Sequence, residues 1–412
     1  MRSALMCALL GAMTLGASAH AATSGSTWVG SWASSQQIPE PRNVLAPASM
    51  NQATVRQIVH LSLGGHTLRV RFSNAFGTKP LRIDAAHIAR AVAPDSSAIA
   101  AGSDKPLTFG GAAQVTIPAG AEYWSDPVHL QMAPGASLAV SYYLPKAPAR
   151  ETSHPGSRAT SYYVAGDHVA DHVLKGAKTV DHWFQLSGVD VKADTHARCI
   201  VALGDSITDG HATQTNKNQR WTDYLAARLQ HHAGTNDVCV LNEGIGGNRL
   251  LHYGLGPAAM ARLNRDVLAQ TGARYVIVLE GINDIGTLGL EKHVTAAQHT
   301  ALVHQLILSF KQIVARAHAH GLEVIGGTIM PFAHSDYYHP SAASLRDRDQ
   351  VNAWIRAPGH FDKVIDFDKA MRDPAHAEQL NPAYDSGDHL HPGPKGYQAM
   401  ARAIPLSLFT AR

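Results

Sequence analysis

The feature that most constrains the fold of this sequence is a change of pattern near Ala193. From there to the C-terminus, short apolar runs alternate with longer segments of helical periodicity. The apolar runs expected as strands are 199–203, 238–241, 275–279, 322–329 and 364–367, and the expected helices are 221–231, 257–270, 294–320, 343–355 and 394–408. Continuous apolar strands with helices between them predict an α/β fold, with a parallel sheet covered on both faces.

The preceding residues, from about Trp28 to Val191, have a strand-like pattern without a convincing amphipathic helix. The expected strands are 54–63, 67–72, 81–88, 113–117, 128–132 and 137–143. The first two flank Gly64-Gly65, which predicts a β-hairpin. Short strands separated by Gly, Pro and Asn predict an all-β sandwich, resembling a jelly roll.

The length of 412 residues exceeds that of one typical domain. We expect a signal peptide over 1–21, a β-sandwich accessory domain over 27–192 and an α/β domain over 196–412. Met1-Arg2 gives a positive start, 4–15 is apolar, and 17–21 offers small residues suited to cleavage. The apolar stretch is too short to span a membrane. These residues predict a mature chain that begins near Ala22, in the periplasm or outside the cell.

The composition is that of a globular protein, with 45% hydrophobic and 16% charged residues. The net charge of +3 leaves no basic stripe that would indicate a nucleic-acid partner. After cleavage two cysteines would remain, Cys199 and Cys239, on neighbouring expected strands. An oxidising compartment permits a disulfide between them, but two buried free thiols fit the sequence equally well.

Four polar or small residues follow expected strands of the parallel sheet. They are Ser206, Gly247, Asn283 and His391, after the first, second, third and fifth strands. Because ligands bind outside the carboxyl ends of parallel strands, we expect these residues to meet at one edge of the sheet.

These residue types can together perform nucleophilic catalysis. Ser206 needs a base to take its proton, and His391 can be that base. Asp388 lies three residues before His391 and could orient its ring. The backbone N–H groups of Ser206 and Gly247 and the amide of Asn283 could stabilise an oxyanion.

Each of these roles has a neighbouring competitor. Gly246 competes as an oxyanion donor, His389 as the base and Asp385 as the orienting carboxylate. The spacing favours the residues named first. We expect Asp284, rather than Asn283, to cap the helix that follows.

Four sequence blocks resemble those of the SGNH (GDSL) hydrolase family, in the family's order. They are Gly204-Asp205-Ser206, the turn at Gly247, Gly281-Ile282-Asn283-Asp284 and Asp388-His389-Leu390-His391. The resemblance runs from about residue 197 to the C-terminus. It implies a flavodoxin-like three-layer fold that needs no cofactor. It also implies a nucleophile, Ser206, with Asp388 and His391 completing the triad, and Gly247 and Asn283 as oxyanion donors.

With its strand-rich leading half, the chain looks most like secreted two-domain esterases associated with xylan degradation. The resemblance implies a serine esterase that hydrolyses short-chain acyl esters, acetyl foremost, on carbohydrates. Its partner would be a small-molecule or polysaccharide ester, with no nucleic acid and no membrane insertion. The alternatives are a glycan-binding protein with a secondary hydrolase half and a lipid-directed acylhydrolase.

Two residue classes have alternative interpretations. The 25 histidines invite a metal site, but none has zinc-ligand spacing, so no metal is expected. Aromatic side chains of the strand-rich half could stack on sugars, although they are more often part of a core. They are Trp28, Trp32, Tyr162, Tyr163 and Trp183.

Overall fold

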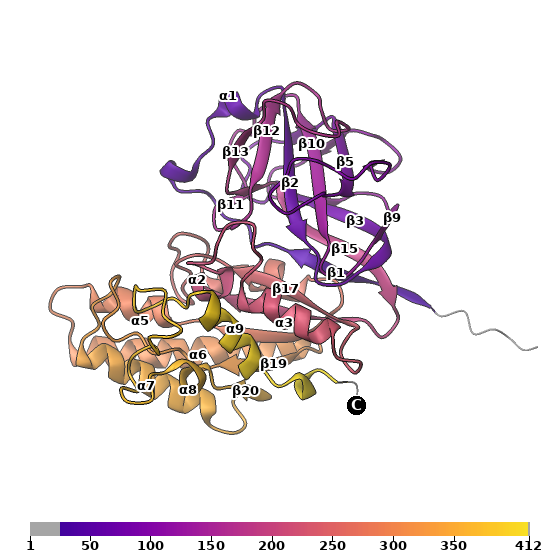
Figure 1. Cartoon of the computed structure of the whole chain (residues 1–412). Coiled ribbons are helices and arrows are strands. Elements are labelled where there is room, and N and C mark those ends of the chain that lie inside the picture. The colour runs from indigo at the N-terminus through magenta and orange to yellow at the C-terminus, as the bar shows by residue number, and fades with distance from the viewer. Residues whose placement is uncertain (1–24, 411–412) are drawn as a thin grey trace, which may run out of the picture.

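The computed structural model describes residues 25–410. The expected signal peptide and its cleavage site lie outside these residues. Figure 1 shows a strand-rich part, formed by the N-terminal half, seated on a part in which helices surround a sheet. The change of architecture follows the change of sequence pattern near Ala193, because β15 (Leu186–Asp194) is the last strand of the strand-rich part.

The C-terminal part is built on a five-stranded parallel sheet. Its strands are β16 (Arg198–Gly204), β17 (Val238–Gly244), β18 (Ala273–Leu279), β19 (Glu323–Gly327) and β20 (Lys363–Ile365). The order across the sheet is β17-β16-β18-β19-β20. This is the 2-1-3-4-5 order of flavodoxin-like folds. The prediction of a parallel sheet is confirmed.

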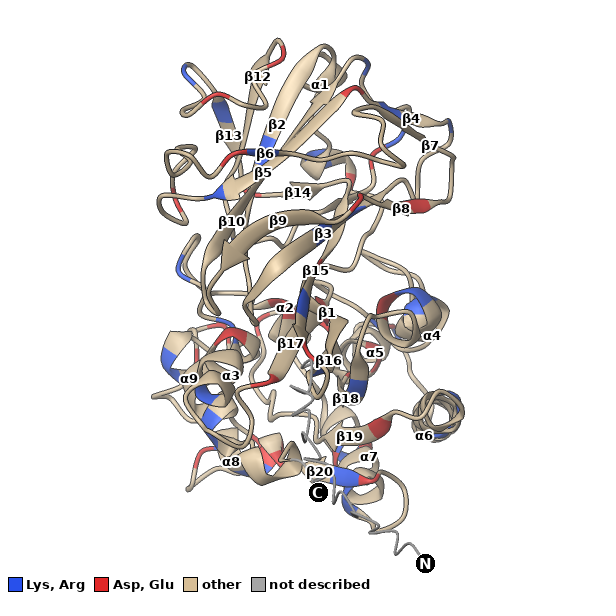
Figure 2. Cartoon of the chain, turned by 90° about the vertical axis from the view of Figure 1, so that its right-hand side faces the viewer, with Lys and Arg blue, Asp and Glu red and all other residues tan. Residues whose placement is uncertain are grey.

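Helices cover both faces of this sheet, as Figure 2 shows. One face carries α3 (Trp221–Gln230), α8 (Phe367–Met371) and α9 (Pro394–Ala403). The other carries α4 (Ala259–Leu263) and α6 (Ala296–Ala319), with α5 (Ile282–Gly289) and α7 (Ala342–Arg356) packed on α6. The helix expected over 257–270 is shorter than predicted and continues as a π-helical turn over Asn264–Leu268.

The N-terminal part consists largely of strands in antiparallel sheets. One sheet has the order β1-β15-β3-β8, with β9 also on β3, and the other has the order β13-β12-β2-β10-β5-β6. The first comprises β1 (Ser26–Ala33), β3 (Gly65–Ser73), β8 (Glu122–Trp124), β9 (Val128–Met132) and β15. The second comprises β2 (Ala53–His60), β5 (Ala85–Arg90), β6 (Lys105–Pro106), β10 (Ser137–Leu144), β12 (Ser161–Ala165) and β13 (Lys178–Val180).

Short pairs complete this part, namely β4 (Leu81–Ile83) with β7 (Val115–Ile117) and β11 (Ser153–His154) with β14 (Trp183–Phe184). A four-residue helix, α1 (Pro47–Met50), also occurs. The sandwich arrangement stays a prediction.

The expected hairpin of 54–63 and 67–72 is wrong, because β2 and β3 belong to different sheets. The segment between them is buried and bonded elsewhere. Leu61 is fully buried and its N–H donates to the carbonyl of Ala136 at 3.0 Å, while the Ser62 hydroxyl donates to the Ser31 carbonyl at 2.7 Å. The alternating pattern on either side of the glycines therefore predicted two strands correctly, but not the strands with which they pair.

The two parts share one hydrophobic core. Strand β1 packs along β17, and a side chain at Gly30 would lie 2.8 Å from Leu241, so the close approach needs glycine there. The Gly30 N–H donates to the carbonyl of Thr271 at 2.9 Å. The buried Ser35 hydroxyl donates to the carboxylate of Glu243 at 2.6 Å. The strand-rich part is therefore packed firmly against the carboxyl-terminal sheet.

Cys199 and Cys239 form a disulfide, which decides between the two alternatives left open by the sequence. They lie directly opposite each other on β16 and β17, with their Cα atoms 4.5 Å apart.

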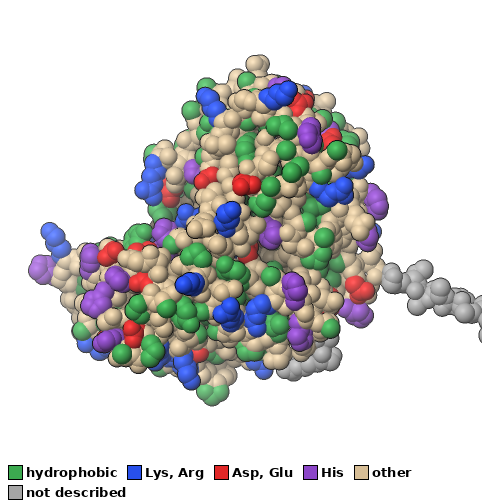
Figure 3. All heavy atoms as spheres, viewed as in Figure 1, with side chains coloured by type: hydrophobic (Ala, Val, Ile, Leu, Met, Phe, Trp, Pro, Cys, Tyr) green, Lys and Arg blue, Asp and Glu red, His purple; other side chains and the backbone are tan. Residues whose placement is uncertain are grey.

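Surface charge is mixed, and Figure 3 shows that Lys, Arg, Asp, Glu and His side chains are spread over both parts of the visible face.

Candidate active site

A tight turn at the carboxyl end of β16 presents Ser206. The Asp205 carboxylate accepts from the N–H of Ile207 at 2.9 Å and so caps the four-residue helix α2 (Ser206–Asp209). The helix ends at Gly210, whose φ of 93° lies in the left-handed region. A Cβ at Gly204 would lie 2.2 Å from the Thr208 hydroxyl, so only glycine fits before the turn. Ser206 stands at the start of α2 and is 8% exposed.

Ser206, His391 and Asp388 form a continuous chain of hydrogen bonds. The Ser206 Oγ lies 2.7 Å from His391 Nε2, and His391 Nδ1 lies 2.7 Å from Asp388 Oδ2. The other carboxylate oxygen of Asp388 accepts from the backbone N–H groups of His391 and Leu390 at 2.8 and 3.0 Å. Burial favours a higher pKa for Asp388, but these hydrogen bonds outweigh burial and hold its pKa well below the usual range. The Asp388 carboxylate is therefore ionised.

The two competing residues of this loop pair with each other. His389 Nδ1 lies 2.7 Å from Asp385 Oδ2, and the His389 side chain is 50% exposed. The structure thus places His391, not His389, against Ser206. It places Asp388, not Asp385, against His391.

The loop after β17 brings Gly247 beside the serine turn. The Ile245 N–H donates to the carbonyl of Gly204 at 3.0 Å and ties the two loops together. Gly247 has a φ of 67°, and a Cβ there would lie 2.8 Å from Leu255, so the position favours glycine on two grounds. Within residues 25–410, the N–H groups of Ser206 and Gly247 donate to no protein acceptor. Both are therefore available to a ligand.

The amide of Asn283 is fixed by hydrogen bonds at both ends. Its Nδ2 donates to the carbonyl of Asn248 at 2.8 Å, and its Oδ1 accepts from the Tyr338 hydroxyl at 2.6 Å. An amide nitrogen carries two hydrogens, so one remains for a ligand. The contact with Asn248 places Asn283 beside the Gly247 loop. Hydrogen bonds therefore join Ser206, His391 and Asp388 directly. Asn283 is tied to the loop of Gly247, and that loop is tied to the serine turn.

The expected capping role of Asp284 is wrong. Helix α5 begins at Ile282 after Gly281, which has a φ of 110°, and no side chain caps it. The Asp284 carboxylate instead accepts from the N–H groups of Leu250 and Leu251 at 2.8 and 3.1 Å. Burial raises the pKa of Asp284 to about 6. The residue anchors the segment that follows the Gly247 loop, a partner distant in sequence.

Residues 202–399, about half the chain, match the GDSL-like lipase/acylhydrolase family. This domain belongs to that family. Its strands and helices form the SGNH hydrolase fold. No match was found among curated proteins.

Solved structures similar to the GDSL-like domain share low sequence identity with it. Axe2, an acetylxylan esterase from Geobacillus stearothermophilus, is 20% identical, with a TM-score of 0.40 over 52% of this chain and 95% of its own. A putative acylhydrolase from Bacteroides fragilis is 21% identical, with a TM-score of 0.38 over 52% and 88%. The α/β hydrolase LAE5 from the metagenome of Lake Arreo is 23% identical, with a TM-score of 0.38 over 51% and 95%.

A buried arginine of the GDSL-like domain supports the loops of the site. Arg262 is 2% exposed and donates to the Asn248 side chain at 2.8 and 3.0 Å. It also donates to the carbonyls of Gly204 at 3.0 Å and Glu243 at 2.6 Å, at the ends of β16 and β17. Sequence reasoning missed Arg262, because an arginine in a helical segment usually faces solvent.

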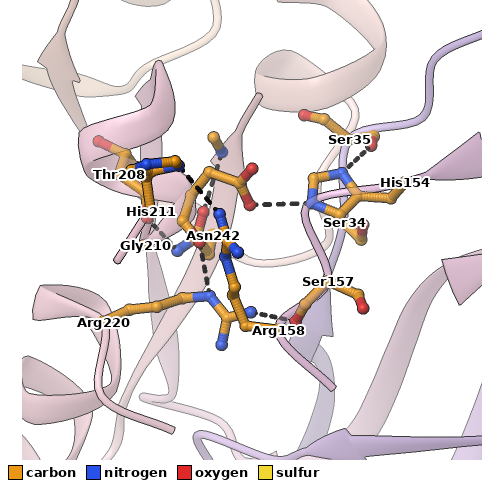
Figure 4. Close-up of polar contacts among 12 residues, drawn as sticks. Ser34, Ser35, His154, Ser157, Arg158, Thr208, Gly210, His211, Arg220 and Asn242 are labelled. Atoms are coloured by element: carbon orange, nitrogen blue, oxygen red, sulfur yellow. Dashed lines mark hydrogen bonds and ion pairs between the residues drawn. The ribbon is translucent and has the colours of Figure 1, made fainter. Parts of the chain in front are cut away.

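The strand-rich part also contacts the serine turn, as Figure 4 shows. His154 Nε2 lies 2.9 Å from the Asp209 carboxylate, and its Nδ1 lies 2.8 Å from the Ser35 carbonyl. Arg220 bridges the two parts by donating to the carbonyls of Asp209, at 2.9 Å, and Ser157. These contacts were not foreseen, because no local pattern relates residues so far apart in sequence.

A second histidine, His211, stands beside His391 and was also missed. Among residues 25–410, His211, Asp388 and His391 form the group whose potential metal-ligating atoms all lie within 4.8 Å of one another. Both ring nitrogens of His391 are already engaged, one by Ser206 and one by Asp388. We therefore assign this group to the hydrogen-bonded chain and not to a metal.

Proposed function

We propose that this protein is an exported serine esterase that removes short acyl groups, acetyl foremost, from a carbohydrate or another alcohol. The observation that carries the proposal is the unbroken chain of hydrogen bonds from Ser206 through His391 to Asp388. It stands at the sheet edge where Gly247 and Asn283 offer free donors. Membership of the GDSL-like lipase/acylhydrolase family supports acyl transfer as the reaction class.

In the proposed reaction, His391 takes the proton of the Ser206 hydroxyl as its oxygen attacks the ester carbonyl carbon. The negative charge that develops on the carbonyl oxygen is stabilised by the N–H groups of Ser206 and Gly247 and by the amide of Asn283. The ionised Asp388 stabilises the imidazolium of His391. His391 then protonates the leaving alkoxide, and the acyl group remains on Ser206.

Water completes the cycle by the same route. His391 removes a proton from a water molecule, whose oxygen attacks the acyl-enzyme carbonyl. Collapse of the second tetrahedral intermediate returns the proton to Ser206 Oγ and releases the carboxylic acid. Every proton moves through one ring nitrogen, the Nε2 that faces Ser206.

An exposed aromatic ring beside the base supports a carbohydrate as the alcohol. Tyr337 is 49% exposed and meets the His391 ring edge-on, with centroids 5.4 Å apart. A tyrosine face suits the apolar face of a sugar ring. Trp32 and Trp183, considered for this role in the sequence, are instead 7% and 6% exposed and pack against each other.

Export is part of the proposal because the sequence begins with a signal-like segment. The disulfide between Cys199 and Cys239 supports an oxidising compartment, either the periplasm or the extracellular space. Within the described residues, no helix has the length and apolar character needed to cross a bilayer.

The proposal is tested by measuring hydrolysis of aryl esters of increasing acyl length, together with acetate release from acetylated xylan. We expect the highest kcat/KM for acetyl esters and its loss in Ser206→Ala. The matched control is Ser407→Ala, which removes an exposed hydroxyl near the C-terminus. Wild-type turnover in Ser206→Ala would refute the nucleophile, and a preference for long acyl chains would favour a lipid substrate.

A further inference from the structure

His211 is held rigidly beside the proposed base. Its ring centroid lies 4.1 Å from that of His391, with the ring planes at 41°. Its backbone N–H donates to the Ser206 carbonyl at 2.9 Å, and its own carbonyl accepts from the Tyr397 hydroxyl at 2.7 Å. These bonds fix the backbone of His211 against the serine turn.

An arginine from the strand-rich part fixes the ring of His211. Arg158 lies between β11 and β12, and its Nη2 is 3.1 Å from His211 Nδ1 (Figure 4). A guanidinium only donates hydrogen bonds, so His211 Nδ1 must accept. The charged form of histidine has no accepting nitrogen, so this contact requires a neutral His211.

The neutral form leaves the proton of His211 on Nε2. This nitrogen lies 3.3 Å from the Tyr337 hydroxyl and 4.0 Å from Asp388 Oδ2. The backbone of Arg158 is held in place, because its carbonyl accepts from the Asn216 N–H at 2.9 Å.

The charge of His211 bears directly on the proposed reaction. His391 becomes positively charged when it takes the proton of Ser206, and a second charged ring at 4.1 Å would oppose that step. We infer that Arg158 helps to keep the half-buried His211 uncharged and so allows His391 to act as a base in mildly acidic solution. Arg158 and His211 would be positioning residues of the proposed esterase, on whose function this inference rests.

The other groups around His211 do not reverse this effect. Burial lowers the pKa of His211 most, followed by the charges of His391 and Arg158. The carboxylates of Asp388 and Asp209 act in the opposite direction, and the net result is a pKa of about 4. Tyr337 faces the ring with its hydroxyl, 3.3 Å from Nε2.

The decisive variant is Arg158→Met, which keeps a long apolar stem but removes the donor and the charge. We expect its kcat/KM for 4-nitrophenyl acetate to differ from wild type by about twofold or less at pH 8. The loss should grow to about threefold at pH 5.5, because removing Arg158 raises the pKa of His211 and a part of the molecules then carries a charged His211 beside His391. Adding His211→Phe keeps an aromatic ring without a titrating nitrogen. The double variant should therefore have the wild-type dependence of kcat/KM on pH between 5.5 and 8.

The control is Arg42→Met, a change of an exposed arginine in the same part of the chain. An equal loss at every pH would overturn the inference, because it would show a purely structural role for Arg158. An unchanged profile would overturn it as well.

A second readout separates this inference from the proposed function. In the Ser206→Ala background, the protonation of His211 can be followed by NMR through the Cε1–H signals of the histidines. The signal of His211 is the one that is missing in His211→Phe. We expect it to titrate below about pH 5 with Arg158 present and at a higher pH in Arg158→Met. Equal titration in both would refute the inference whether or not the protein cleaves esters. Failure of the wild type to cleave any ester would refute only the proposed function.

Discussion

Replacing Tyr338 by phenylalanine tests how the candidate oxyanion amide is held. The Tyr338 hydroxyl donates to Asn283 Oδ1 at 2.6 Å, and burial raises the pKa of Tyr338 to about 12, so the donor stays protonated in any practical assay. The ring lies close against Gly286, where a Cβ would be 2.4 Å from it. Tyr338→Phe keeps this packing and removes one hydrogen bond.

The expected loss of kcat in Tyr338→Phe depends on the hydrogen bond that Asn283 keeps. Asn283 would still donate to Asn248 at 2.8 Å, so its amide would be less well fixed but not lost. A net contribution of about 0.5–1.5 kcal/mol for a neutral hydrogen bond corresponds to a fall in kcat of about 2- to 13-fold. Asn283→Ala removes the donor itself and should lower kcat by about 10²–10³. Because the donor acts on charge formed in the transition state, KM should change little in both variants.

The assay is steady-state hydrolysis of 4-nitrophenyl acetate by the two single variants, the double variant and the control Tyr123→Phe, which alters an exposed tyrosine on β8. If Tyr338 acts only through Asn283, the double variant should be no slower than Asn283→Ala. Multiplicative losses in the double variant would refute the reasoning. So would an unchanged kcat in Tyr338→Phe together with a large loss in Asn283→Ala.

Two further predictions concern stability. Burial raises the pKa of Glu151 to about 7 from 4.5, so its stabilising contribution is complete below about pH 4.5 and is lost as the pH rises through 7. The Glu151→Gln side chain can still accept the hydrogen bond from the Leu45 N–H. In urea unfolding, the variant should have about the same free energy of unfolding as wild type at pH 5 and a higher one at pH 8, by up to about 3 kcal/mol. An equal difference from wild type at both pH values would contradict this prediction. Arg262→Met should lower the free energy of unfolding by about 3–5 kcal/mol, because Arg262 pairs with the buried carboxylate of Asp266 at 3.1 Å, whose pKa lies below its usual value. Thermal unfolding with an unchanged midpoint would show that Arg262 does not have this role.

The sequence predicted the carboxyl-terminal sheet well because its strands are buried on both faces. Such strands are apolar throughout and bounded by polar turns, so their number, direction and ends follow from the pattern. The loops after these ends carry Ser206, Gly247, Asn283 and His391, so the sequence alone could indicate the candidate site. Alternation in the amino-terminal half showed strands but not their pairing, and the hairpin between β2 and β3 was therefore wrong.

Supporting residues were missed for a different reason. Their partners are distant in sequence and only the tertiary structure brings them close. Arg262 contacts Asn248, 14 residues away, and Gly204, 58 residues away. Arg158 and His211, which contact each other, are 53 residues apart. Nothing in their local sequence distinguishes them from surface charges. The predicted capping role of Asp284 was wrong for the same reason. Its carboxylate accepts from backbone N–H groups 33 and 34 residues away and not from those of its own helix.

The most direct test is covalent trapping of Ser206. The wild type would be treated with a fluorophosphonate, and the modified residue located by mass spectrometry while residual esterase activity is measured. The account predicts one label per chain, on Ser206, activity lost in proportion to labelling, and little labelling in His391→Ala. A label on another serine, or full activity in fully labelled protein, would contradict it.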